Sequence, residues 1–200
     1  MQIVFKVATH PNEYAKIFKS REIICSIDFP YLLDYSKPNP AEDQFDNYSF
    51  LLYAALGDEV IGSCRATPCR NNLWEISGSL PDGLTLPVDT AACLQLNRVY
   101  IDKQYRNINL HAVMFYELAS WVLQHTNYTE YFATCNAGLV RFYKRIGSEL
   151  GYPFPFKLSG RGQHNYYLVK GKINDFKNYN EQLFENYGNT TNGIQRNQLS

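Results

Sequence analysis

Two different spacings of apolar residues along the chain mark the expected secondary structure. Residues 11–28 carry apolar side chains at helical spacing, and Pro11 suits the first position of a helix. The pair Gly57-Asp58 between two apolar runs indicates a tight hairpin. The expected strands are 2–8, 49–56, 59–67, 92–101, 129–134 and two short ones within 152–170 around Ser159–Gly162, and the expected helices are 11–28, 108–124, 136–147 and 176–187.

The fourth expected strand has an irregular pattern. Leu94 and Leu96 share one parity, whereas Val99 and Ile101 share the other. Because side chains of a strand alternate between two faces, this slip by one residue predicts a β-bulge near Asn97-Arg98.

Two long segments without periodicity, 30–46 and 70–91, interrupt these elements, and long ordered loops are often functional. The tail at 188–200 has almost nothing to bury, so we expect it to be disordered. The order of the elements predicts an α/β fold with a mixed sheet flanked by helices, in a single domain over residues 1–187.

Composition narrows the class of protein. The 200 residues are 45% hydrophobic, which suits one compact core, and the net charge of zero provides no general attraction to nucleic acid or an anionic membrane. The five cysteines are scattered without a C-x-x-C pair, which favours a reducing cytoplasm and argues against a metal site. No signal peptide is evident, and no apolar run approaches the ~20 residues that span a bilayer. We expect a cytoplasmic protein without a membrane span, a nucleic-acid partner or a metal.

Motifs for nucleophilic hydrolysis, phosphoryl transfer, zinc chemistry and dinucleotide binding are absent. The run VYIDKQYRNINLH at 99–111 instead resembles motif A of the GCN5-related N-acyltransferases, where the start of a helix binds a diphosphate. Two glycines of that motif are replaced by Asn109 and His111, which favours an acyl carrier protein donor over tightly bound coenzyme A. The resemblance implies an acyl-coenzyme A or acyl carrier protein thioester held by Val99, Ile101, Arg106, Asn107, Asn109 and His111.

The run NAGLVRFYKRIG at 136–147 resembles motif B of the same family. Asn136, Tyr143 and Gly147 match its spacing. The resemblance implies that Asn136 supports the strand-to-helix junction beside the donor. It also implies that the phenol of Tyr143 protonates the departing thiolate.

Five polar residues, Arg21, Asp43, Asp46, Arg65 and Arg98, occur in the order found in acyl-homoserine-lactone synthases and long-chain N-acyl amino acid synthases, which this chain resembles over about 15–147. The resemblance implies an acceptor with an amine and a carboxylate. Asp43 and Asp46 would hold its ammonium group. A forked guanidinium of Arg65 or Arg98 would hold its carboxylate.

Three positions depart from the lactone synthases. Gln95 stands in place of a strand glutamate, and Cys25 and Tyr31 replace aromatic residues of the S-adenosylmethionine site. Gln95 remains a candidate acceptor-binding residue. These departures favour an amino acid or another small amine as the acceptor.

A basic helix face is formed by Arg141, Lys144 and Arg145, where the lactone synthases dock an acidic carrier protein. Such a face would attract an acyl carrier protein, or it is an ordinary solvated surface.

The expected reaction is direct attack of an amine on a thioester held in a gap beside the bulge, with Asn97, Arg98 and Tyr143 as catalytic candidates. Three alternatives remain open. The first is a lactone-forming synthase that uses S-adenosylmethionine, and the second is a short-chain N-acetyltransferase that uses acetyl-coenzyme A. The third is a non-catalytic protein that binds an acyl ligand.

Overall fold

A computed structural model describes residues 2–70, 74–158 and 164–188 and confirms the mixed α/β architecture. The strands are β1 Ile3–Val7, β2 Phe50–Leu56, β3 Glu59–Pro68, β4 Cys93–Ile101, β5 Glu130–Asn136, β6 Glu149–Leu150, β7 Phe156–Lys157 and β8 Asn165–Lys172. The α-helices are α1 Pro11–Asp28, α2 Leu110–His125, α3 Ala137–Arg145 and α4 Ile173–Gly188, and the 3-10 helices are η1 Pro30–Leu32, η2 Asp46–Tyr48 and η3 Lys103–Ile108.

The strands form one sheet with a change of direction in its middle. Within the described residues, eight strands pair in the order β1-β2-β3-β4-β5-β8-β6, with β7 beside β8. β4 and β5 pair in parallel, and the other described pairs are antiparallel. A parallel pair needs a crossover connection, which η3 and α2 supply here.

The two parallel strands separate soon after they meet. They pair from Cys93 with Glu130 to Leu96 with Ala133. Both strands then continue, to Ile101 and Asn136, without pairing with each other. The sheet is therefore open between the second halves of β4 and β5.

The predicted bulge in β4 is confirmed. Arg65 of β3 pairs with Asn97 and Ser63 pairs with Tyr100, so Arg98 and Val99 lie opposite a single residue of β3. Arg98 has a φ of 51°. A non-glycine residue in this left-handed region costs of order 1 kcal/mol, so contacts around Arg98 must hold it there.

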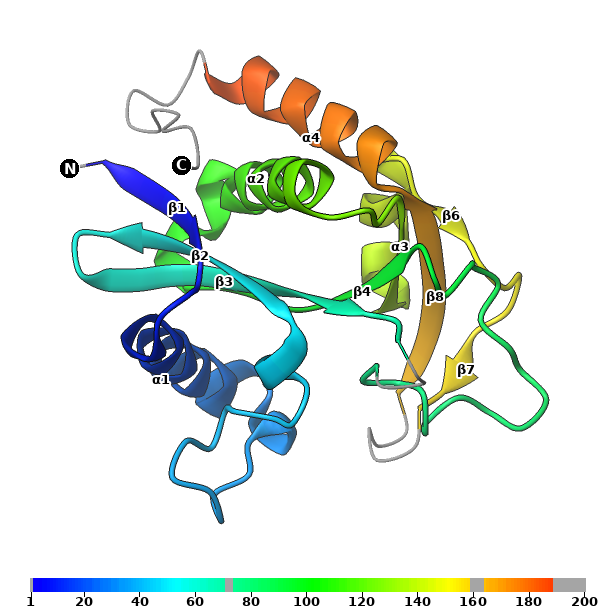
Figure 1. Ribbon diagram of the computed structural model, residues 1–200, viewed down its shortest axis with the longest axis horizontal. Helices are drawn as coiled ribbons and strands as arrows, with labels where there is room; N and C mark the ends of the chain where they lie inside the picture. Colours follow the sequence, from blue (N-terminus) through cyan, green and yellow to red (C-terminus); the bar gives the residue numbers. More distant parts are fainter. Residues whose placement is uncertain (1, 71–73, 159–163, 189–200) are drawn as a thin grey trace.

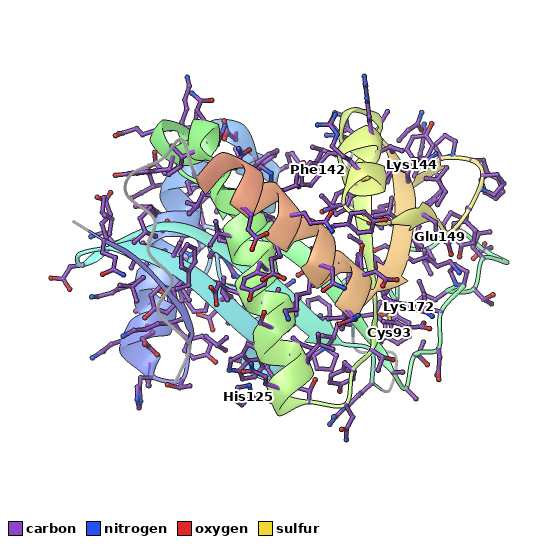
Figure 2. All side chains as sticks on the ribbon, turned by 90° about the horizontal axis from the view of Figure 1, so that it is seen from above. Cys93, His125, Phe142, Lys144, Glu149 and Lys172 are labelled. Atoms are coloured by element: carbon purple, nitrogen blue, oxygen red, sulfur yellow. The ribbon has the colours of Figure 1, made fainter. Side chains whose placement is uncertain are left out.

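Helices cover both faces of the sheet: α2 and α4 lie on one face and α1 on the other (Figure 1). The main core lies under α2, α3 and α4, where Phe115 packs against Phe176 with ring centroids 5.0 Å apart. Figure 2 shows Phe142 on the side of α3 that faces α2 and α4, with Lys144 on the outer side. The core thus fixes which face of α3 is exposed.

Some expected boundaries differ from the structure. α2 begins two residues later than predicted because η3 and the left-handed Asn109, with a φ of 53°, precede it. α4 begins at Ile173 instead of 176, directly after β8. The expected turn at 159–162 and, beyond Gly188, the expected disordered tail lie outside the described residues. No described helix has the length and apolar character needed to cross a membrane.

Candidate active site

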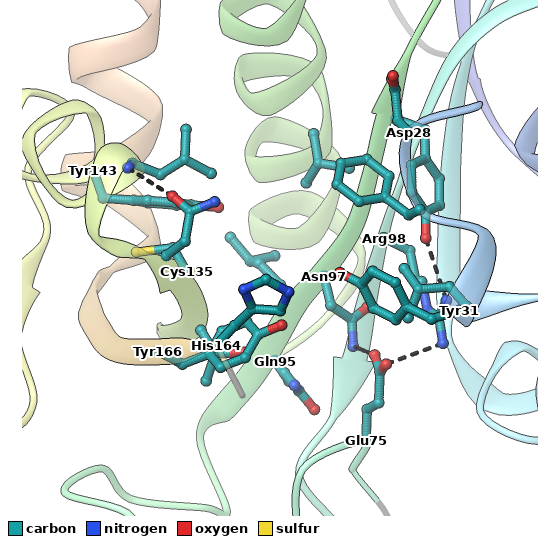
Figure 3. Close-up of a pocket in the computed structure, with 18 residues that line it drawn as sticks. Asp28, Tyr31, Glu75, Gln95, Asn97, Arg98, Cys135, Tyr143, His164 and Tyr166 are labelled. Carbon is teal, nitrogen blue, oxygen red and sulfur yellow. Dashed lines mark hydrogen bonds and ion pairs between the residues drawn. The ribbon is translucent and has the colours of Figure 1, made fainter. Parts of the chain in front are cut away.

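A cleft of about 370 Å³ opens where β4 and β5 separate. Figure 3 shows Tyr143 and Cys135 on one side of it and Asp28 and Arg98 on the other. The described residues that line it come from α1 and the turn after it, the 70–91 loop, both strands, α3 and the start of β8. They are Asp28, Phe29, Tyr31, Leu32, Glu75, Gln95, Leu96, Asn97, Arg98, Val99, Tyr100, Thr134, Cys135, Asn136, Leu139, Tyr143, His164 and Tyr166.

Tyr143 is held at this opening by the start of α3. The side chain of Asn136 caps the helix, since its Oδ1 accepts a hydrogen bond from the backbone N–H of Leu139 at 3.2 Å. Tyr143 is 7% exposed and lines the cleft. Burial, with smaller contributions from Cys135, Tyr131 and Cys64, raises the pKa of the Tyr143 phenol well above its ordinary value. The phenol therefore carries its proton at neutral pH, as a general acid must.

A buried ionic network lies behind β4 and contains all five polar residues of the sequence pattern, together with Glu75. Arg21 contacts Asp46 at 2.8 Å. Arg65 contacts Asp43 at 2.5 Å, Glu75 at 2.8 Å and Asp46 at 3.0 Å. Three arginines face three carboxylates among the described side chains of this network, so its formal charges balance. Buried charges that are paired in this way are stable only as a set.

Arg98 connects the network to the cleft. Its guanidinium contacts Asp43 at 2.9 Å, Glu75 at 3.0 Å and the hydroxyl of Tyr100 at 3.2 Å. Burial opposes its charge, but Glu75, Tyr100 and Asp43 outweigh that effect and raise the pKa of Arg98. The same contacts hold its strained backbone at the bulge.

The predicted acceptor-binding residues divide into two groups. Gln95 lines the cleft, and its Oε1 atom is buried without a hydrogen bond from any described group. Arg21, Asp46 and Arg65, at 1%, 1% and 0% exposure, lie behind the cleft wall and bind one another. The structure therefore does not bring Asp46 and Arg65 to the described cleft lining, and their direct contact with an acceptor stays a prediction.

Asp43 also faces the network. Burial disfavours its charged form, but the guanidinium groups of Arg65 and Arg98 outweigh burial and lower the pKa of the carboxyl. A carboxylate with a lowered pKa is a poor base. Asp43 binds Arg98 and is absent from the described cleft lining, so its role as ammonium site or base stays a prediction that the cleft geometry does not support.

The residues expected to bind the donor are also divided. Val99 and Asn136 line the cleft, whereas Ile101, Arg106, Asn107, Asn109 and His111 lie outside its described lining. Arg106 binds the carboxylate of Asp28 and the backbone carbonyl of Ile101. The His111 ring packs on Phe142 with centroids 5.0 Å apart, and burial lowers the pKa of the imidazole. His111, at the second glycine position of motif A, thus packs between α2 and α3.

Sequence reasoning singled out Tyr31 but did not predict that other aromatic residues would line the cleft with it. The ring centroids of Tyr31 and His164 are 6.5 Å apart, and those of Phe29 and Tyr100 are 6.4 Å apart. These contacts join the turn after α1 to the residue just before β8 and to β4. The high tyrosine content was a signal, but it did not say which rings would meet.

The basic face of α3 is exposed at Arg141, Lys144 and Arg145, as expected for a helix whose other side packs in the core. In the part of the chain that the structure describes, no group of three or more His, Cys, Asp or Glu side chains has the arrangement of a metal site.

A family model described as the acetyltransferase (GNAT) family matches residues 20–147. A search of curated proteins gives no significant match.

Among solved structures, a coenzyme A-dependent acyl-homoserine lactone synthase, BjaI, aligns with a TM-score of 0.70 at 12% identity, covering 99% of this chain and 95% of that one. The N-acyl amino acid synthase FeeM, from uncultured soil microbes, gives 0.59 at 12% identity, with 89% and 94% covered. A GNAT-family acetyltransferase from Staphylococcus aureus Mu50 gives 0.55 at 13% identity, with 85% and 99% covered. At these identities the similarity shows the fold, and the match over 20–147 shows that the chain belongs to the GNAT family of N-acyltransferases.

Proposed function

We propose that this enzyme transfers an acyl group from a phosphopantetheine thioester, either acyl-coenzyme A or an acyl carrier protein, to the amine of an amino acid or a similar small acceptor. The observation that carries the proposal is the opening between β4 and β5 with the protonated phenol of Tyr143 on its wall. The fold similarity to BjaI and FeeM supports the same direction.

The proposed reaction is one direct displacement. The pantetheine arm lies in the gap like an added strand, and a backbone N–H beside the bulge at Asn97-Arg98 polarises the thioester carbonyl. The amine nitrogen attacks the carbonyl carbon, a C–N bond forms and the amine proton leaves to water. The C–S bond then breaks, and the thiolate takes the proton of the Tyr143 hydroxyl, which solvent restores.

A carrier-protein donor is supported by the basic face of α3. Arg141, Lys144 and Arg145 are exposed there, and Asn136 at the start of the same helix lines the cleft. An acidic partner on this face would place its arm near the opening. We also place the enzyme in the cytoplasm, which agrees with its five free, buried cysteines.

Thiol release tests the proposal. Acetyl, octanoyl and hexadecanoyl groups, each carried by coenzyme A and by an acyl carrier protein, are offered with each of the twenty L-amino acids, with simple alkylamines and with S-adenosylmethionine. Acylated products are identified by mass spectrometry. Amine-dependent thiol release with an amino acid supports the proposal. Thiol release confined to acetyl-coenzyme A and alkylamines favours a short-chain N-acetyltransferase. Formation of methylthioadenosine from S-adenosylmethionine favours a lactone-forming synthase. Thioester binding without release under any condition refutes transfer.

Tyr143→Phe tests the proton donor, and Tyr131→Phe is its matched control. Tyr131 is also buried, but its hydroxyl bonds to Ser148 at 2.6 Å and lies outside the described cleft lining. We expect kcat to fall about 100-fold in Tyr143→Phe and to stay near wild type in the control. Unchanged kcat in Tyr143→Phe removes this residue from the mechanism.

A further inference from the structure

Glu75 is an unexpected acidic residue of the cleft. It lies in the 70–91 segment, in a turn where the N–H of Ser77 donates to the carbonyl of Trp74 at 3.0 Å. Trp74 and Ile76 on either side of it are buried in a second apolar cluster against β5 and β8. These two anchors fix the turn, and the side chain of Glu75 extends to β4 instead.

The contacts of Glu75 join three residues around the bulge. One carboxylate oxygen accepts from Arg65 at 2.8 Å and from the amide of Asn97 at 2.7 Å, and the other accepts from Arg98 at 3.0 Å. Its side chain is 7% exposed and lines the cleft (Figure 3). The acidic group is therefore held rigidly beside the strand that would receive the thioester.

An ammonium group entering the cleft meets two described carboxylates, Asp28 and Glu75. Asp28 ends α1 and is bonded to Arg106, which lies outside the described lining. Glu75 contacts Asn97 and Arg98 directly at the bulge. The carboxylates first expected to serve, Asp43 and Asp46, face the interior network. Of the two carboxylates in the described cleft lining, Glu75 is thus the one whose described contacts reach the bulge.

On the basis of the proposed function, we infer that Glu75 binds the ammonium end of the acceptor, next to Arg98, which binds its carboxylate. An ion pair that lines a cleft offers both charges to a ligand that carries both, and a charge-assisted bond to each end fixes its orientation. Asn97 and Arg65 keep the carboxylate of Glu75 in place for this role. The turn at Trp74–Ser77 thereby contributes to the selection of amines in the cleft.

The test compares two ligands in Glu75→Gln. The first is the amino acid that gives the most thiol release in the wild-type protein, and the second is the same molecule without its amine, used as a competitive inhibitor. We expect the KM of the amino acid to rise about ten- to hundredfold, because an ionic hydrogen bond is lost. The inhibition constant of the amine-free competitor and the KM of the acyl thioester should stay within about twofold of wild type.

Three further measurements make the result decisive. Glu59→Gln, at an exposed position at the start of β3, is the matched control and should change none of these constants. Glu75→Asp keeps the charge on a shorter side chain and should raise the KM of the amino acid less than Glu75→Gln. The melting temperature of Glu75→Gln reports whether that variant folds. If it does not fold, Glu75→Asp is compared with wild type instead.

An equal loss for the amino acid and for its amine-free analogue would overturn the inference, because Glu75 would then only hold Arg98. An unchanged KM for the amino acid would overturn it as well. Either result leaves acyl transfer intact, whereas the absence of amine-dependent thiol release in the wild-type protein refutes the proposed function itself.

Discussion

Replacing Arg65 by methionine is expected to destabilise the fold far more than removing a surface charge. Arg65 is 0% exposed, and its guanidinium contacts Asp43, Asp46 and Glu75 at 2.5–3.0 Å. Methionine fills part of the same space without a charge. Among the described side chains of the network, two arginines would then remain against three carboxylates, so one buried negative charge loses its partner.

The magnitude follows from how the protein can remove this surplus charge. At pH 7 the variant can protonate one carboxyl group. An ordinary carboxyl pKa of about 3.9 lies about 3 pH units below pH 7, and each unit costs about 1.36 kcal/mol, so this protonation costs roughly 4 kcal/mol. Removing one partner of a buried ion pair costs about 3–5 kcal/mol in other proteins, in agreement with this value. The folded variant then binds about one proton more than wild type, so its deficit should shrink by roughly 1.4 kcal/mol for each unit of falling pH above pH 4.

Urea unfolding of both proteins at pH 7 and pH 5 measures these differences. Lys16→Met is the control, because Lys16 and Asp58 form an exposed pair at 3.1 Å, and its loss should cost less than about 1 kcal/mol. A loss below about 1 kcal/mol for Arg65→Met at pH 7, or a deficit that does not change between the two pH values, would refute the reasoning.

Three other expectations follow from the site. Because burial raises the pKa of Tyr143, the acid form persists to high pH, and kcat should show no decline below about pH 10; a decline centred near pH 8 would contradict Tyr143 as the acid. Asn136→Ala removes the cap on the N–H of Leu139 and should lower the free energy of unfolding by about 1 kcal/mol, whereas Asn136→Asp, which preserves an acceptor, should cost less than half of that. The double variant Arg141→Glu/Arg145→Glu should slow transfer from an acyl carrier protein, with the largest loss at low salt, and leave transfer from coenzyme A unchanged; equal effects on both donors would exclude docking there.

The sequence predicted features that depend on near neighbours. Pro11 and the apolar spacing after it gave the bounds of α1, and the parity slip between Leu96 and Val99 located the bulge. Asn109, which replaces a glycine of the motif, adopts the left-handed conformation that its side-chain type tolerates. Each of these depends on backbone geometry within a few residues, which the local pattern determines.

The sequence did not predict how the charges pair. Asp43 and Asp46 were expected to face an acceptor, but they bind arginines of α1, β3 and β4 that are 19 or more positions away. Glu75 lies in a segment without periodicity, which gave no sign of its importance. Its inferred role in binding the acceptor depends on the contact between this loop and β4. Pairing between distant segments is set by tertiary structure, and no local pattern indicates it.

The balanced network also constrains how this enzyme could change in evolution. A single charge substitution among Arg21, Asp43, Asp46, Arg65, Glu75 and Arg98 leaves a neighbour uncompensated, so these positions can change only in compensating pairs. Gln95 and His164 line the same cleft without any ion pair in the described structure. New substrate preferences should therefore arise first at these two positions, while the charged network behind them persists.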